Sequence, residues 1–138
     1  MTGAESDRSR ATDAVAVREA RPDERVAVRR VVDAAMLEPG DVAGAIERGD
    51  ALVAVDSGTV VGALLLGPRE DGAHVDAAAV RRARRGRGIG TALVEFAAER
   101  ADRLTAHFDP DVRPFYEALG FEIEPVGEGE DRLRGTRG

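Results

Sequence analysis

The sequence predicts a single α/β (α+β) domain in which short strands and helices follow one another along the chain. The 138 residues, 43% of them hydrophobic, are enough for one domain with a real core. Two apolar runs, 51–55 and 60–66, flank a short polar segment, as in a β-hairpin. A third run ends at Val80, and after a glycine-rich turn the apolar residues recur at helical spacing.

The N-terminal segment predicts a tail and then a first strand. Residues 1–13 are polar, charged and aperiodic, so we expect a mobile tail there and one domain over 14–138. Weak alternation of apolar and polar residues predicts a strand at 14–18.

Two helices are expected next. Pro22 favours the first turn of a helix, and the segment 38–40, Glu-Pro-Gly, breaks it. Its apolar stripe consists of Val28, Val31, Val32, Ala35 and Met36. A short second helix is predicted at 41–48 and is ended by Gly49.

The central part of the chain predicts a hairpin, a further strand and the longest helix. Residues 56–59 form the tight turn of the hairpin. Glycine and proline predict a turn at 67–72, which leads into a strand at 73–80. The helix is expected at about 90–101, with Ile89, Leu93, Phe96 and Ala97 on one stripe.

The C-terminal part predicts short elements joined by tight connections. A strand at 104–108 precedes a loop at 109–114, whose proline opens a helix at 115–119. An alternating strand is predicted at 121–126. The last residues either add a strand around 132–134 or fray.

The charge of the chain is acidic overall and basic in one place. The net charge is −6, all 20 basic residues are arginine, and lysine, asparagine and glutamine are absent. Two explanations stay open: codon bias of a GC-rich genome, and adaptation to high salt. The overall acidity argues against general nucleic-acid binding, and the five arginines between Arg81 and Arg87 stand out against it.

Composition excludes several kinds of chemistry. Without cysteine there is no disulfide, thiolate metal site or cysteine nucleophile, and two histidines make a multi-histidine metal centre a poor expectation. We therefore expect no metal. No apolar run is long enough to span a bilayer, and the N-terminus does not have the pattern of a signal peptide. A soluble cytoplasmic protein that does not bind membranes is expected.

The glycine-rich turn after Val80 predicts a binding site for a phosphorylated ligand. Glycines let the backbone approach a ligand closely, and the first N–H groups of the following helix have no internal partner. A P-loop is excluded because the chain has no lysine. A dinucleotide fingerprint counted from Gly86 fails at Thr91, although Asp109 supplies an acid about twenty positions on.

Residues Arg85-Gly86-Arg87-Gly88-Ile89-Gly90 fit the pattern Arg/Gln-x-x-Gly-x-Gly/Ala. This stretch resembles the acetyl-CoA pyrophosphate loop of the GNAT (GCN5-related N-acetyltransferase) family. A second stretch, 115–121 or Phe-Tyr-Glu-Ala-Leu-Gly-Phe, is similar to another motif of the family. The resemblance covers nearly the whole chain after the tail. It implies the GNAT fold, a central, mixed, mostly antiparallel sheet of six to seven strands flanked by about four helices.

The resemblance implies acetyl-CoA as cosubstrate and direct attack of an amine on its thioester, without a metal. The pyrophosphate would lie on the backbone N–H groups of residues 87–91, and the pantetheine along Ala78–Val80 like an added strand. Arg85 and Arg87 are the arginines expected to contact phosphate, whereas Arg81, Arg82 and Arg84 are also explained as a solvated surface. The implied cofactor-binding residues are Ala78, Val80, Arg85, Gly86, Arg87, Gly88, Ile89, Gly90, Thr91 and Asp109.

The resemblance also implies catalytic groups. The Tyr116 phenol would protonate the leaving CoA thiolate as a general acid, unless it is only a half-buried aromatic. Asp76 or His74 would be the base, since both are expected on one face of the strand with Ala78 and Val80. The alternatives are that these residues only form an exposed polar face of the strand, or that a chain of water molecules or an amine that arrives already neutral makes a base unnecessary. His107 is a lone histidine and more often structural.

Two positions depart from the family pattern. Arg82 stands where many members have proline, which removes a rigid turn but keeps the loop. Asp109 stands where many have an asparagine that hydrogen-bonds the pantetheine. A carboxylate accepts but does not donate at neutral pH, so this contact is lost, reversed, or made by the backbone.

The leading function is an N-acetyltransferase acting on a primary amine of a small molecule or a protein. A non-catalytic acyl-CoA-binding sensor is the alternative, and a nucleic-acid binder lacks the interleaved aromatics. The acceptor is expected between the first two helices, the 67–73 loop and the 109–114 loop. Acids in those segments hint at a cationic acceptor: Glu38, Asp41, Asp71 and Asp109. Because dimers are common in the family, a homodimer stays open.

Overall fold

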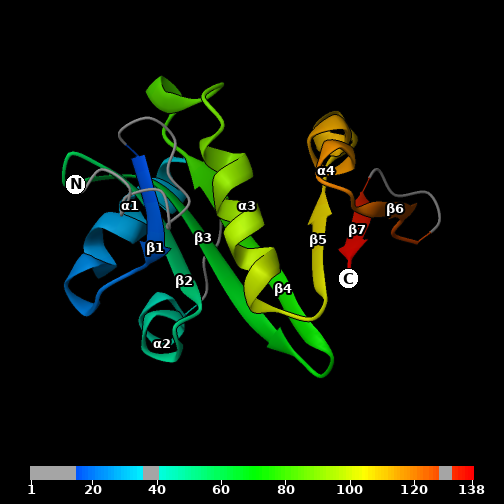
Figure 1. Ribbon diagram of the computed structural model, residues 1–138, viewed down its shortest axis with the longest axis horizontal. Helices are drawn as coiled ribbons and strands as arrows, with labels where there is room; N and C mark the ends of the chain where they lie inside the picture. The colour runs from blue at the N-terminus through cyan, green and yellow to red at the C-terminus, as the bar shows by residue number, and fades with distance from the viewer. Residues whose placement is uncertain (1–14, 36–40, 128–131) are drawn as a thin grey trace, which may run out of the picture.

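The computed structural model describes residues 15–35, 41–127 and 132–138, so the N-terminal tail, Met36 and the helix break at 38–40 lie outside the described residues. Within the described part, seven strands form one sheet (Figure 1). The strands are β1 (Val15–Glu19), β2 (Ala51–Asp56), β3 (Thr59–Arg69), β4 (Gly72–Val80), β5 (Leu104–Phe108), β6 (Glu122–Pro125) and β7 (Leu133–Arg137). Their order is β1-β2-β3-β4-β5-β7-β6. Only β4 and β5 pair in parallel, which confirms the mixed, mostly antiparallel sheet.

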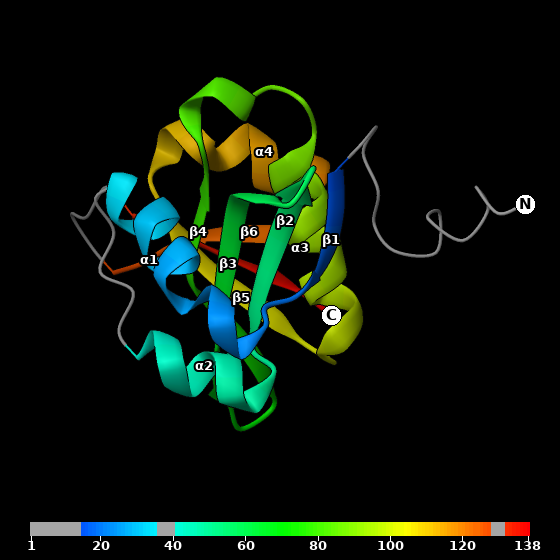
Figure 2. The same cartoon turned by 90° about the vertical axis from the view of Figure 1, so that its left-hand side faces the viewer.

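Helices cover both faces of this sheet. They are α1 (Arg25–Ala34), α2 (Val42–Arg48), α3 (Ile89–Arg100) and α4 (Arg113–Ala118). Short 3-10 turns precede three of them: η2 (Pro22–Glu24), η3 (Arg82–Arg84) and η4 (Pro110–Val112). Figure 2 shows α1 and α2 on one face of the sheet and α3 on the other. The core accordingly has two parts, one around Leu64 and Leu93 under α3, the other around Val28 and Leu65 under α1 and α2.

The turn between β3 and β4 is shorter than predicted. The turn expected at 67–72 is wrong, because β3 continues to Arg69 and β4 begins at Gly72. Gly67 and Pro68 pair with His74 and Ala73 near the end of the hairpin, where a missing proline N–H affects the ladder only locally. A Cβ on Gly72 would overlap the Arg103 carbonyl, so glycine there permits the close approach of the chain that leads into β5.

A β-bulge in β4 changes which face its side chains occupy. Leu65 lies opposite Ala77 and Leu66 opposite Val75, so Asp76 is an extra residue. Val75 and Val80 pack into the core under α3, whereas Ala77 and Ala79 pack under α1 and α2. The expectation that His74, Asp76, Ala78 and Val80 share one face is therefore wrong: Ala78 and Val80 lie on the α3 face, and His74 and Asp76 on the other.

The sheet opens between β4 and β5. The two strands pair only through residues 73–75 and 104–106. Beyond these rungs they run apart, toward the end of the sheet where α3 begins and α4 lies (Figure 1). The edge of β4 from Asp76 to Val80 is left without a neighbouring strand on this side. We call this opening the split.

Candidate active site

The loop between β4 and α3 holds its glycines in conformations that other residues avoid. Gly86 has φ 79° and Gly88 has φ 81°, both left-handed, and Gly88 is the N-cap of α3. Helix bonding starts with the Ala92 N–H, which donates to the Gly88 carbonyl at 3.0 Å. The N–H groups before Ala92 therefore have no intrahelical acceptor, and the loop offers a cradle of donors at the positive end of the helix dipole.

A cavity of about 570 Å³ connects this loop with the edge of β4, the first turns of α3, and α4. Nine residues that the sequence predicts for the site line it: Ala78, Val80, Arg85, Gly86, Gly88, Ile89, Gly90, Thr91 and Tyr116. Arg87 and Asp109 do not line it, and neither do the base candidates His74 and Asp76.

The free edge of β4 presents backbone groups to the split. The Arg81 N–H donates to the Val61 carbonyl at 2.8 Å, so Val80 and Gly62 form a non-hydrogen-bonded pair. The N–H and C=O groups of Val80 and, two residues earlier, Ala78 then point away from β3. These groups are suited to pairing with an extended ligand. Arg85 Nε already donates to the Val80 carbonyl at 3.0 Å, which leaves Ala78 as the free rung.

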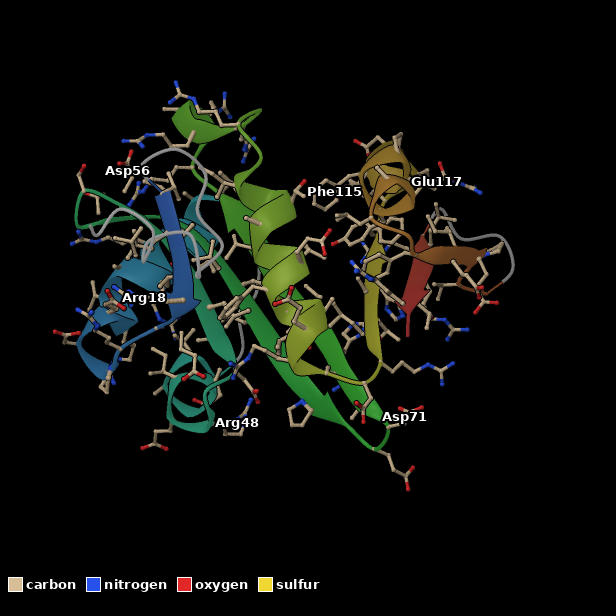
Figure 3. The ribbon with its side chains drawn as sticks, in the orientation of Figure 1. Arg18, Arg48, Asp56, Asp71, Phe115 and Glu117 are labelled. Carbon is tan, nitrogen blue, oxygen red and sulfur yellow. The ribbon has the colours of Figure 1, made fainter. Side chains whose placement is uncertain are left out.

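Two arginines of the loop are held by contacts to the neighbouring strands β2 and β3. Arg84 forms an ion pair with Asp56 at the end of β2, and Arg81 Nε donates to the Val60 carbonyl at 3.1 Å. The Arg84 guanidinium holds the pKa of the Asp56 carboxyl below its usual range. Arg84 also lines the cavity, so it is not the plain solvated surface that the sequence allowed. Figure 3 shows Asp56 next to this loop.

Tyr116 is enclosed by aromatic rings. Its side chain is 6% exposed and stacks on Phe108 with ring centroids 4.2 Å apart, and Phe115 and Phe121 contact it edge-on. Among the described residues its hydroxyl has no hydrogen-bond partner. Burial raises the pKa of the phenol, so it stays protonated at neutral pH. A buried, neutral O–H at a cavity wall is available to donate a proton or a hydrogen bond.

Phe115 closes the wall between α4 and α3. A Cβ added to Gly90 would lie 3.6 Å from the Phe115 ring, so the two helices approach closely there. Figure 3 shows Phe115 extending from α4 toward α3. Phe115 is not among the site residues expected from the sequence, although its place beside Tyr116 in the second motif marks it.

Both candidate bases lie away from this cavity. His74 Nδ1 is 2.7 Å from Thr105 Oγ1, and its ring lies edge-on to His107 at 4.8 Å. Burial is the main reason why the pKa of each imidazole is lowered, so both rings are neutral at pH 7. Asp76 lies against Gly67 and faces Arg69 at 3.9 Å.

The acids that hinted at a cationic acceptor have other partners. Asp41 caps α2 by accepting a hydrogen bond from the Gly44 N–H at 2.9 Å, and Asp71 pairs with Arg103 at 3.0 Å. Asp109 pairs with Arg132 at 3.2 Å, and Glu38 lies outside the described residues.

In the described part of the chain, no group of three or more His, Asp or Glu side chains could hold a metal ion, and no helix is long and apolar enough to cross a membrane.

A family model described as "Acetyltransferase (GNAT) domain" matches residues 47–123. The chain belongs to the GNAT family. The match runs from the end of α2 to the start of β6 and includes both motifs. No curated protein sequence matches the chain.

Solved structures of GNAT proteins share the fold. Ard1 from Thermoplasma volcanium is 20% identical, with a TM-score of 0.73 over 90% of this chain and 97% of that chain. A GNAT-family protein from Desulfovibrio desulfuricans is 25% identical, with a TM-score of 0.70 over 90% and 98%. Diaminobutyrate acetyltransferase EctA from Paenibacillus lautus, solved with L-2,4-diaminobutyric acid and coenzyme A, is 16% identical, with a TM-score of 0.67 over 91% and 95%.

Ala35 and Val112 are among the cavity residues of this GNAT domain that were not expected from the sequence. Ala35 at the end of α1 and Val112 in η4 line the same cavity as Tyr116. Neither side chain has a polar or reactive group that would mark it in the sequence. Only the fold brings the two residues to the same cavity. Both add apolar surface to the lining, to which Arg84 and Arg85 contribute basic groups.

Proposed function

We propose that this GNAT domain is an N-acetyltransferase that transfers the acetyl group of acetyl-CoA to a primary amine by direct attack. One observation carries the proposal: Tyr116, whose protonated hydroxyl has no hydrogen-bond partner among the described residues, lines the same cavity as the glycine loop and the free edge of β4. The pyrophosphate would bind the N–H groups at the start of α3, with Arg84 or Arg85 beside it. The pantetheine would pair with Ala78, which places its thiol end along β4.

The proposed chemistry balances without a covalent enzyme intermediate. The amine nitrogen attacks the thioester carbonyl carbon, the C–S bond breaks, and Tyr116 gives its proton to the leaving sulfur. The amine loses a proton to water, or to His74 or Asp76 through water, because neither side chain lines the cavity. Solvent then reprotonates Tyr116, which favours the neutral form.

Acetyl-CoA binding to the glycine loop is tested by calorimetry. We expect the wild-type protein to bind acetyl-CoA and Gly88→Trp to abolish binding, because the indole would fill the cradle at the α3 N-cap. Arg25→Trp, exposed at the start of α1, is the matched control and should bind like the wild type. A folded wild-type protein that binds no acetyl-CoA would refute the proposal.

Tyr116→Phe separates catalysis from binding. It removes only the hydroxyl, so CoA release with an accepted amine should slow by about 10²-fold or more, with acetyl-CoA affinity retained. The second candidate function, a non-catalytic acyl-CoA sensor, is favoured by the position of both base candidates outside the cavity. Binding without turnover for any amine, and no effect of Tyr116→Phe, would establish the sensor.

Three expectations from the sequence stay predictions. A cytoplasmic location, a homodimer and adaptation to high salt each need their own measurement. Repeating the acetyl-CoA titration in multi-molar salt tests the last of them, since binding only at high salt would support a halophilic protein.

A further inference from the structure

A second cavity, of about 400 Å³, contains both histidines of the chain. It is formed by the β3–β4 turn, β4, β5 and β7, and is lined among others by Arg69, His74, Thr105, His107 and Arg134. Thr105 and His107 alternate with Leu104, Ala106 and Phe108, which pack in the core under α3. The cavity therefore lies on the opposite face of the sheet from α3.

The two imidazoles keep free nitrogens in this cavity. His74 Nδ1 is bonded to Thr105 Oγ1 at 2.7 Å, and the His107 ring meets His74 edge-on at 4.8 Å. In the described part of the chain neither ring has a further hydrogen-bond partner. A ligand that reaches the cavity thus finds His74 Nε2 and both His107 nitrogens available.

The charges that act on these rings are mostly positive. Arg69 lowers the pKa of both imidazoles, and Arg132 and Arg134 lower that of His107, whereas Asp76 alone acts in the opposite direction, on His74. These arginines are paired with carboxylates that do not line the cavity: Arg69 with Asp76, Arg132 with Asp109, and Arg134 with Glu124. Arg103, Asp71 and Glu70 also line the cavity, and Arg103 pairs with Asp71, so three arginines and two acids line it in all. On a chain of net charge −6, the field at the rings therefore favours an anion.

The histidine pair lies next to the split. His74 pairs with Thr105, and the next rung, Val75 with Ala106, is the last one that joins β4 to β5. Ala78, where the pantetheine would pair, lies four residues farther along, which is roughly 13 Å of strand. The acetyl-CoA cavity reaches both faces of the sheet, since it is lined by Leu93 on the α3 side and by Ala35 and Ala79 on the α1 side. The histidine cavity lies on this second side.

We propose that the histidine cavity binds an anionic group, a carboxylate or a phosphate, of the amine acceptor, so that the amine reaches the thioester through the split. This inference rests on the proposed function. It replaces the expectation of a cationic acceptor, which rested on acids of the chain. Of these acids, Asp41 caps a helix, and Asp71 and Asp109 form ion pairs.

The first test measures anion binding without acetyl-CoA. Because the chain has only two histidines, their NMR titrations are assigned with His74→Gln and His107→Gln. Sodium acetate and sodium phosphate should each raise the pKa of both rings relative to sodium chloride at equal ionic strength, since a bound anion favours the charged imidazole. Equal pKa values in all three salts would overturn the proposal.

Arg69→Gln should weaken this anion binding about tenfold, because Arg69 lines the cavity together with both histidines. Arg113→Gln removes the same charge from an exposed ion pair on α4 and is the matched control; its anion affinity should stay within twofold of the wild type. Equal loss in both variants would indicate an effect of net charge alone and would overturn the proposal.

The second test compares acceptors that differ only in charge. In a CoA-release assay, β-alanine and 3-aminopropyl phosphate should have KM values at least tenfold lower than β-alaninamide and 3-aminopropanol. Arg69→Gln should remove most of this preference. Equal KM values overturn the proposal. If no amine is turned over, the proposed function fails, and the salt titration alone then decides whether the cavity binds anions.

Discussion

At the scale of single residues, the contact between Asp56 and Arg84 links the loop between β4 and α3 to the hairpin of β2 and β3. The carboxylate at the end of β2 holds a guanidinium that lines the cavity, and Arg87 also acts on its pKa. Arg81 makes a second link through the Val60 carbonyl. The loop that would bind pyrophosphate is thus fixed from outside its own motif.

Asp56→Asn should raise the Kd for acetyl-CoA several-fold, because Arg84 would lose the partner that positions it. Asp33→Asn, exposed on α1, removes the same charge and is the control. Calorimetry of Asp56→Asn, Arg84→Met and the double variant checks the link: losses that do not add indicate one shared contact, whereas additive losses would contradict it.

At the scale of elements, the parts that carry local patterns were predictable. The glycine spacing predicted the turn between β4 and α3, and the aromatic motif predicted the helix α4, since both depend on neighbours in sequence. The bulge at Asp76 was not predictable, because the run of alanines at 77–79 has no apolar–polar alternation that would mark a change of face. For the same reason the faces of His74 and Ala78 were misjudged.

Long-range contacts were also beyond the sequence. Ala35 and Val112 reach the cavity from elements far apart in the chain, and Arg69 meets the histidines because β3 runs longer than Gly67 and Pro68 suggested. Gly67 and Pro68 favour a turn by their residue type, but they stay in β3 because β4 pairs with them.

Gly72→Ala tests the closest backbone approach in the hairpin of β3 and β4. The added Cβ would overlap the Arg103 carbonyl, so we expect a loss of about 2 to 4 kcal/mol in the free energy of unfolding. Gly58→Ala, at φ 83° with open space around it, should cost only about 1 kcal/mol of strain. Urea denaturation compares the two, and equal losses would show that the overlap relaxes without cost.

At the scale of the whole molecule, acid should destabilise the fold in two separate ranges of pH. Both histidines have a pKa below the unfolded value of about 6.5, so the unfolded chain takes up protons first. Stability should fall as the pH drops below about 6.5 and level off below the folded pKa values. The Glu24 carboxyl, whose pKa Arg18 lowers, adds a second loss only below about 4.5.

Urea midpoints between pH 7.5 and 5 measure the first range. The variant with both His74→Gln and His107→Gln should lose most of this dependence and keep the decline below pH 4.5. An unchanged profile between pH 7.5 and 5 in that variant would show that other groups cause it.

The split between β4 and β5 also affects how the molecule moves. Backbone bonding joins the strands on its two sides only through residues 73–75 and 104–106, so this seam is the weakest line across the sheet. A ligand that pairs with Ala78 would supply the missing rungs and act as an eighth strand. The gap beyond these rungs would then be closed only while the ligand is bound, and amide hydrogen exchange along β4 and β5 should slow when acetyl-CoA occupies the seam.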